Sequence, residues 1–216
     1  VLARIPTHRL VDTPELALAA AARLLLANRF ADLPPHLQRA RSQATSSDPD
    51  VAAGTRIGLL LFSIAVARAR GDNAGVVASA SRALDELTDQ GMTLPASHGY
   101  RAVALANLGT GQLWAGLLAE SEQTLTDALA EAEGTALDAT RVNMLSHLAL
   151  AHAVSGRLRT AHELASQATR IVEQRGWAPM VQVASAHLAL AIVHLQRNEL
   201  DLALGALADG RPLAAM

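Results

Sequence analysis

Apolar residues in the stretch 100–132 fall mainly at steps of three and four, the period of an α-helix with one buried face. One apolar series, which includes Leu108 and Trp114, stops at Gly116, and a second series, which includes Leu125, begins after it. Glycine accepts the left-handed backbone conformation that commonly ends helices. The stretch therefore predicts two helices joined by a tight turn. Such a pair needs similar neighbours to bury its apolar face.

The same pattern continues along the chain and predicts ten helices and no strand. The expected helices cover about residues 13–28, 33–45, 50–70, 73–89, 96–115, 118–133, 135–155, 158–175, 179–196 and 199–208. Thr13-Pro14-Glu15 combines a capping residue, a first-turn proline and an acid, which is typical of a helix start. We expect a lead-in segment at 1–12, a single helical-repeat domain at 13–208, and a tail at 209–216 that frays because it contains Gly and Pro.

The predicted turns are periodic. Their central residues are 43, 45, 40 and 42 positions apart and are Asn28, Gly71, Gly116, Gly156 and Asn198. All are Gly or Asn, the residues that best accept a positive φ. Twelve positions beyond the first four turns stand Ala40, Ala83, Ala128 and Ala168. A small residue at a fixed place in every second helix predicts a close approach of helices there.

Composition narrows the function classes. The chain is 50% hydrophobic but only 2% aromatic, which favours closely packed helices over sheets. Its net charge is -2 and all 18 basic residues are Arg, interleaved with acids, so no basic footprint for nucleic acid is present. We attribute the arginines to the codon bias of a GC-rich bacterium. Cysteine is absent, which excludes disulfides and thiolate chemistry. The apolar windows at 16–27 and 58–67 are shorter than the roughly 20 residues needed to cross a bilayer, so we expect no membrane contact.

No constellation of catalytic residues stands out, and a phosphate-binding G-x-x-x-x-G-K-[ST] loop cannot occur without Lys. We therefore predict neither an enzyme nor a cofactor. The eight histidines include the pair His147 and His152, five apart, whereas two zinc ligands on one helical turn are four apart. His152 and His194 share a repeat position, which indicates packing rather than metal binding. Gly109-Thr110-Gly111 lies inside a helix pattern and predicts a close helix-packing point.

Two helix pairs carry a more specific resemblance. The LG…G…A spacing of a tetratricopeptide repeat is matched by Leu108-Gly109, Gly116 and Ala128, and then by Leu148-Ala149, Gly156, Ala161 and Ala168. The units here are longer than the usual repeat of about 34 residues. The phrases ALANLGTGQLWAG, LSHLALAHAVSGRL and SAHLALAIVHLQRNELDLA resemble the helical-repeat domain of MalT-like, LuxR-type ATP-dependent bacterial transcriptional regulators.

The resemblance implies an all-α, right-handed superhelical solenoid of about five antiparallel helix pairs. It also implies a cytoplasmic sensor domain without catalytic activity. Such a domain binds an inducer or a partner protein and relays its state to ATPase and DNA-binding domains outside this segment, which itself does not contact nucleic acid. The alternative is a protein-protein interaction scaffold or oligomerisation module with no small-molecule ligand.

In repeats of this family the first helix of each pair lines the concave face. Carried over by repeat position, the implied binding residues are Arg68, Thr110, Leu113, Trp114, Asn143, Ser146, Leu150, Ile192 and Gln196. Trp114 is the foremost candidate, because Trp is enriched at binding hot spots. The alternative is that these side chains pack between units. The last helix is rich in leucine and has no polar cap, so either more repeats follow in a parent protein or this end pairs with another chain as a homo-oligomer.

Overall fold

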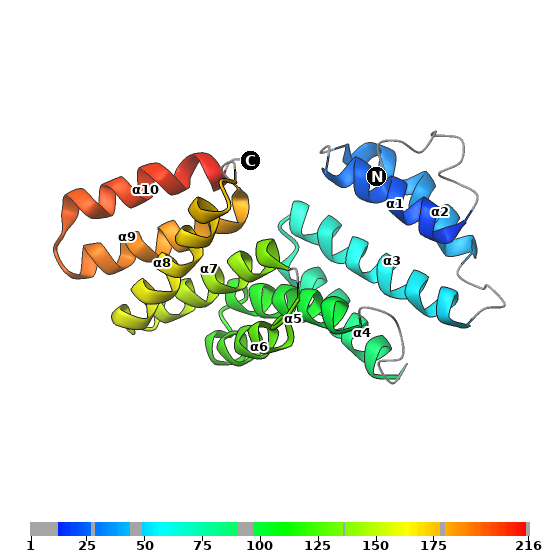
Figure 1. The fold of residues 1–216 in the computed structure, drawn as a ribbon, viewed down its shortest axis with the longest axis horizontal. Coiled ribbons are helices and arrows are strands. Elements are labelled where there is room, and N and C mark those ends of the chain that lie inside the picture. The colour runs from blue at the N-terminus through cyan, green and yellow to red at the C-terminus, as the bar shows by residue number, and fades with distance from the viewer. Residues whose placement is uncertain are drawn as a thin grey trace. The chain divides into compact units, whose positions relative to one another are not determined.

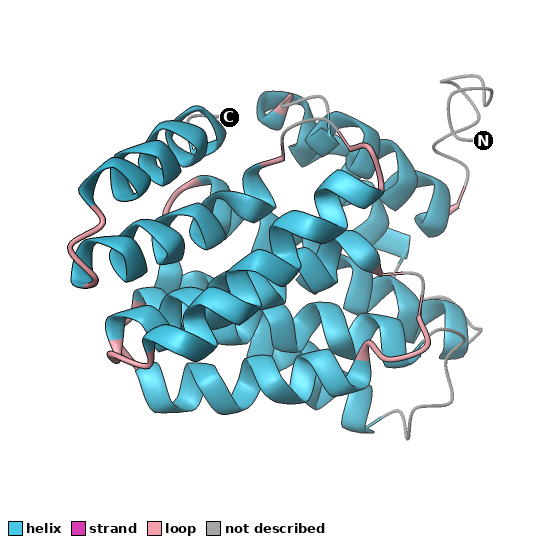
Figure 2. Ribbon diagram, turned by 60° about the vertical axis from the view of Figure 1, so that its left-hand side comes forward, coloured by secondary structure: helices cyan, strands magenta, loops and turns pink. Residues whose placement is uncertain are grey.

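The computed structural model describes residues 13–26, 29–43, 49–89, 97–135, 137–177 and 180–214. These residues form ten α-helices and two short 3-10 turns, with no strand among them (Figure 2). The all-α architecture predicted from periodicity is therefore confirmed. The chain divides into two compact units, Val1–Ser97 and His98–Met216, and each has its own packing.

The first unit contains two helix pairs (Figure 1). Its elements are α1 (Pro14–Leu26), the 3-10 turn η3 (Phe30–Asp32), α2 (Leu33–Gln43), α3 (Pro49–Ala69) and α4 (Asn73–Asp89). Helix α1 packs against α2, and α3 packs against α4. The backbone N–H of Leu16 donates to the Thr13 hydroxyl at 3.4 Å, so Thr13 caps α1 as its sequence predicts. Ala53 and Ile57 of α3 meet Leu87 of α4 in a small buried core.

The apolar part of helix α3 is longer than the window at 58–67 that the sequence analysis considered. Val51–Ala69, 19 residues long, is the one stretch of the described helices long and apolar enough to cross a membrane by length and composition. The shorter window at 58–67 left out the apolar residues that precede it. Core helices of soluble proteins pass the same test, and α3 packs along α4 with Ala53, Ile57 and Ile64 buried. Burial covers 39% of this window, so packing accounts for part of its apolar character.

The second unit stacks three further pairs. Its elements are α5 (Ser97–Trp114, which starts at the unit boundary), α6 (Leu118–Glu131), α7 (Asp138–Val154), α8 (Leu158–Gln174), the 3-10 turn η4 (Val181–Val183), α9 (Ala184–Gln196) and α10 (Leu200–Ala214). Helix α7 packs on α8 and α9 packs on α10, while α7 also contacts α6 and α9. A shared hydrophobic core runs through these hairpins from Leu113 to Leu213.

The turns between paired helices all use one backbone motif. Gly71, Gly116, Gly156 and Asn198 have φ values of 67°, 81°, 77° and 59°. At Gly156 the turn residue donates its N–H to the carbonyl of Ala153 at 3.1 Å, and Arg157 donates to that of His152 at 2.9 Å. This pair of bonds is the Schellman motif, which satisfies the last carbonyls of a helix. Four predicted turns are thus confirmed, and Asn28 lies outside the described residues.

The small residues at the predicted positions are buried. Ala40, Ala83, Ala128 and Ala168 are fully buried. At Gly109 of α5 an added Cβ would lie 2.6 Å from Cγ of Leu125, and the Ser121 hydroxyl donates to the Gly109 carbonyl at 2.7 Å. Glycine is therefore required where α6 crosses α5. The predicted packing point at Gly109 is confirmed.

The C-terminal end differs from the sequence prediction. Helix α10 continues to Ala214, so the expectation of a fraying tail is wrong over residues 209–214. Leu213 is buried in the hydrophobic core, and Gly210 fits against the Cβ of His187, which an added Cβ would approach to 2.8 Å. This burial holds the last turns helical although Pro212 lacks an N–H donor. Gly210 is also twelve positions beyond Asn198, the place that the buried alanines occupy in other pairs.

Candidate interaction surfaces

The predicted concave-face residues separate by burial. Five of them are buried, namely Thr110, Leu113, Asn143, Ser146 and Leu150. The hydroxyls of Thr110 and Ser146 donate within their own helices, to the carbonyls of Ala106 and Val142 at 2.8 and 2.7 Å. In this conformation these side chains pack between helices and offer no polar group to a partner.

The other four remain accessible. Arg68, Trp114 and Gln196 are exposed, and Ile192 is half-buried. Trp114 exposes 51% of its surface and stands two positions before its turn. Val154 holds the same position in α7 and is also exposed. Helices α5 and α7 therefore each end in an exposed apolar residue, and we name these two residues, Trp114 and Val154, the Trp114 surface.

The Trp114 ring contacts a buried histidine. The rings of Trp114 and His147 meet edge to face, with centroids 6.4 Å apart at 83°. The His147 Nδ1 donates to the Asn143 carbonyl at 2.8 Å, because a carbonyl oxygen can only accept. Its Nε2 faces the Ser185 hydroxyl at 3.3 Å. His147 thus ties α5, α7 and α9 together and leaves the rest of the Trp114 ring exposed.

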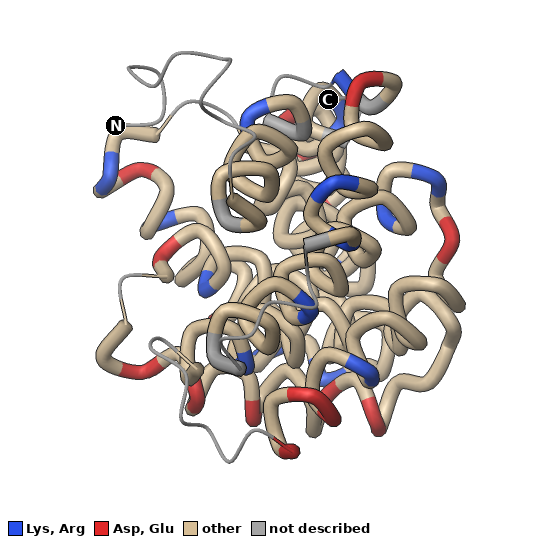
Figure 3. The backbone as a smooth tube through the Cα atoms, turned by 90° about the vertical axis from the view of Figure 1, so that its right-hand side faces the viewer, with Lys and Arg blue, Asp and Glu red and all other residues tan. Residues whose placement is uncertain are grey.

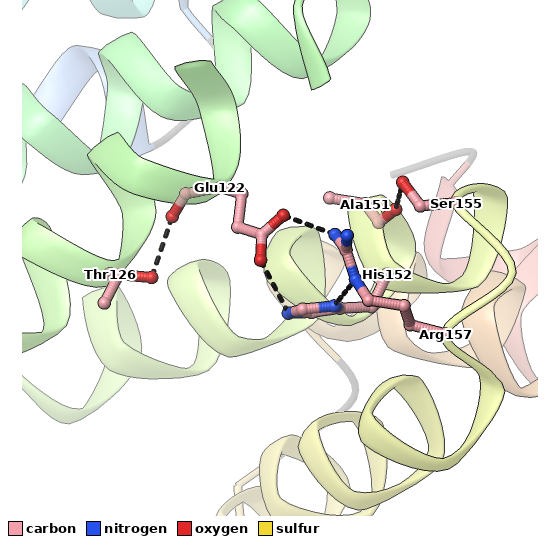
Figure 4. Close-up of polar contacts among 6 residues, drawn as sticks. All are labelled: Glu122, Thr126, Ala151, His152, Ser155 and Arg157. Atoms are coloured by element: carbon pink, nitrogen blue, oxygen red, sulfur yellow. Dashed lines mark hydrogen bonds and ion pairs between the residues drawn. The ribbon is translucent and has the colours of Figure 1, made fainter. Parts of the chain in front are cut away.

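A polar joint lies between α6 and the turn after α7 (Figure 4). Arg157 Nε donates to His152 Nδ1 at 2.6 Å, and its guanidinium also pairs with the Glu122 carboxylate. Glu122 Oε1 lies 3.7 Å from His152 Nε2. Burial lowers the pKa of His152, Arg157 lowers it further, and Glu122 opposes them. Because Nδ1 accepts from Arg157, the neutral ring carries its proton on Nε2, facing Glu122.

The next repeat builds the joint with different residues. His194 Nδ1 lies 2.6 Å from Glu199 Oε2, and the ring of His162 from α8 meets it edge to face at 6.1 Å. His152 and His194 thus each bond a residue just beyond their own turn. Among the described residues no three His, Asp or Glu side chains lie close enough together to hold a metal ion. His147, His152, His162 and His194 each contact residues of another helix or of the turn that follows their own helix.

The first unit has a groove that no sequence pattern predicted. Its volume is about 670 Å³, and it is lined by Leu33, Pro34, Leu37, Gln38, Arg41, Val66, Ala69 and Arg70. No carboxylate is among these residues, and within the described part of the chain neither Arg41 nor Arg70 forms an ion pair. Acidic and basic residues both occur along the described helices (Figure 3), so a lining with cations alone is a local feature. In the sequence these cations appear only as members of two short Arg pairs, 39/41 and 68/70, far apart along the chain. Tertiary packing is what brings Arg41 and Arg70 into one groove.

Comparisons with known proteins identify the fold. No family model and no curated protein matches the chain. The structure of BtubC (BKLC) from P. vanneervenii aligns with a TM-score of 0.65 over 96% of this chain and 82% of that chain, at 15% identity. A putative kinesin light chain from Podosopora anserina with nearly identical TPR-like repeats aligns with a TM-score of 0.55 over 94% and 97%, at 19% identity. A single-substitution form of that protein gives 0.56 over 93% and 94%, also at 19%. The chain therefore has the fold of a TPR-like helical-repeat protein.

Proposed function

We propose that this chain is a non-catalytic protein-interaction scaffold that binds a partner through the Trp114 surface. The observation that carries the proposal is Trp114 itself, half exposed while its ring packs against that of buried His147. A large side chain that is already ordered loses little conformational entropy on binding. Val154 holds the same place at the end of α7, and exposed apolar residues on the first helices of successive pairs suit an amphipathic helix laid across them. The TPR-like fold supports the same function.

The test replaces Trp114 with Ala. A partner captured on the wild-type chain is purified, and its affinity is measured by calorimetry for wild type and W114A. We expect a loss of at least about 30-fold, the size of a hot-spot effect. The unfolding midpoint should change little, because half of the Trp114 surface is already in water.

Leu202→Ala is the matched control for this test. Leu202 is an exposed apolar residue of the same unit that lies on α10, away from the Trp114 surface. Its replacement should leave the affinity unchanged. Equal affinities for wild type and W114A would contradict the proposal, and a loss of stability without a loss of affinity would assign Trp114 to the core.

A second candidate function is the inducer-sensing domain of a MalT-like regulator, which the sequence resembles. The groove of the first unit favours it, since about 670 Å³ is within the range of roughly 300–1,000 Å³ usual for small-ligand sites. Leu33, Leu37 and Val66 provide an apolar floor, and Arg41 and Arg70 provide cations without an acidic partner in the lining. This chemistry suits an apolar molecule with a carboxylate or phosphate group. A bound inducer would signal by favouring one arrangement of the helices.

Thermal shift measurements separate the two functions. Medium-chain carboxylates should raise the unfolding temperature if the groove is a ligand site, whereas alcohols of the same length should not. The double variant Arg41→Gln/Arg70→Gln should lose the shift. No shift with any anion, together with partner binding that depends on Trp114, would favour the scaffold over the sensor.

A further inference from the structure

Successive repeats in the second unit meet at fixed positions. Glu122, six residues beyond Gly116, contacts His152, which is four residues before the next turn at Gly156. His162, six residues beyond Gly156, contacts His194, four residues before Asn198. The sixth residue after one turn therefore packs on the fourth residue before the next turn, and in both cases polar groups meet polar groups.

Helix α10 presents this surface with nothing packed on it in the described structure. The sixth residue after Asn198 is Leu204, which exposes 64% of its surface. Leu200 and Leu207, on the same side of the helix at i−4 and i+3, are also exposed. Their equivalents in α8 are Leu158 and Ala165, which pack in or against the hydrophobic core. Leu200, Leu204 and Leu207 thus form an apolar stripe on α10. On α8 the equivalent stripe faces α9, whereas on α10 no described helix faces it.

Helix α9 extends the same face. Leu188 and Leu195 hold the repeat positions of Ser146 and Ala153 in α7. Ser146 and Ala153 are buried, whereas Leu188 and Leu195 are exposed. We name the terminal apolar face by its five exposed leucines, Leu188, Leu195, Leu200, Leu204 and Leu207. Isolated exposed leucines need no explanation, but five in the register of an internal interface indicate a surface that is covered in the working protein.

The charges beside the stripe favour a second copy of this chain as the partner that binds the terminal apolar face. Asp201 flanks Leu200 at the N-terminal end of α10, and Arg211 continues the stripe one turn beyond Leu207. Within the described residues neither side chain forms an ion pair. When two α10 helices pair antiparallel, Leu204 of one copy meets Leu207 of the other, and each Arg211 lies beside the Asp201 of the other copy. The face is therefore complementary to itself under a two-fold axis.

We propose that the chain forms a homodimer in which the terminal apolar faces meet with their α10 helices antiparallel. The dimer contact is separate from the Trp114 surface, so partner binding and dimerisation are independent properties. Because each copy uses its one terminal face in this two-fold contact, no face is left to bind a third copy, and assembly stops at the dimer.

The first experiment measures molar mass by sedimentation equilibrium over a range of concentrations. Wild type should approach twice the mass of one chain, and Leu204→Glu/Leu207→Glu should remain at the mass of one chain. Both positions are exposed, so circular dichroism should show an unchanged helix content. Leu202→Glu is the matched control, because Leu202 is 57% exposed on another side of α10 and should still dimerise. A wild type that stays monomeric throughout, or L202E dissociating as much as the double variant, would overturn the proposal.

A charge exchange then tests the antiparallel arrangement. Asp201→Arg and Arg211→Asp should each weaken the dimer by at least about tenfold, because each places like charges opposite one another twice. The variant with both changes should return to within about threefold of wild type, since the pairs are restored with reversed sign. A double variant as weak as the single ones contradicts the arrangement. W114A should dimerise like wild type, so failure of the Trp114 proposal and failure of this one are distinguishable.

Discussion

The pairs α7/α8 and α9/α10 share a turn motif, a repeat register and a buried small residue twelve positions after the turn, yet their outer positions differ. In α7 every residue from Val142 to Ala153 is buried. In α9 the residues equivalent to Ser146 and Ala153 are exposed leucines. At these two positions α7, which other helices cover, has Ser146 and Ala153, and α9 has leucines that no described helix covers. At these positions the difference in side chain therefore follows the difference in coverage.

The largest expected difference between the two pairs lies six residues before their turns. Leu150 of α7 is buried in the hydrophobic core, and Leu150→Ala should lower the free energy of unfolding by about 2–5 kcal/mol. Ile192 of α9 holds the same position but is half-buried, so Ile192→Ala should cost clearly less. Urea unfolding of both variants measures the difference. Equal losses would mean that the fifth pair is as well covered as the fourth.

A smaller difference is expected at the turns. Gly156 has φ of 77°, where an L side chain is strained, so Gly156→Ala should destabilise by about 1–2 kcal/mol. Asn198 already carries a side chain at φ of 59°, and Asn tolerates this region. Asn198→Gly should therefore stay within about 0.5 kcal/mol of wild type. A cost at Asn198→Gly as large as that at Gly156→Ala would show that the Asn198 side chain has a role beyond the backbone.

Local chemistry explains what the sequence could predict. The turns at Gly71, Gly116, Gly156 and Asn198 follow from one residue's tolerance of positive φ, and the buried alanines follow from their distance to those turns. The end of α10 depends on contacts far along the chain. From the residues next to them in sequence, Gly210 and Pro212 predict a fraying tail. In the structure Gly210 packs against His187 and Leu213 lies in the hydrophobic core, so the helix continues.

The candidate site was harder to predict for the same reason. Helical periodicity indicates which face of a helix a residue occupies, but not how closely the next helix covers that face. Thr110 and Ser146 share a predicted inner face with Trp114, and coverage by neighbouring helices buries the first two. The groove beside Arg41 and Arg70 requires the packing of α2 and α3, which no local pattern contains.

The smallest expected effect concerns the polar joints, where the fourth repeat has Arg157 beside its histidine and the fifth has Glu199. Burial and Arg157 lower the pKa of His152 below its ordinary value of 6.5. The native state therefore binds this proton less readily than the unfolded chain does. The contribution of neutral His152 to stability is complete above about pH 6.5 and declines as the pH falls through and below that value.

Variants of Arg157, Glu122 and His152 test the direction of this pH dependence. Arg157→Leu removes one cause of the lowered pKa, so the loss of stability between about pH 6.5 and 5 should become shallower, whereas Glu122→Gln removes the opposing charge and should make it steeper. His152→Gln should reduce the loss without abolishing it, because burial also lowers the pKa of His187, which Asp209 partly opposes. Free energies from urea unfolding at several pH values measure each slope. A steeper loss in Arg157→Leu than in wild type would show that Arg157 acts on His152 by holding its ring in place rather than by its charge.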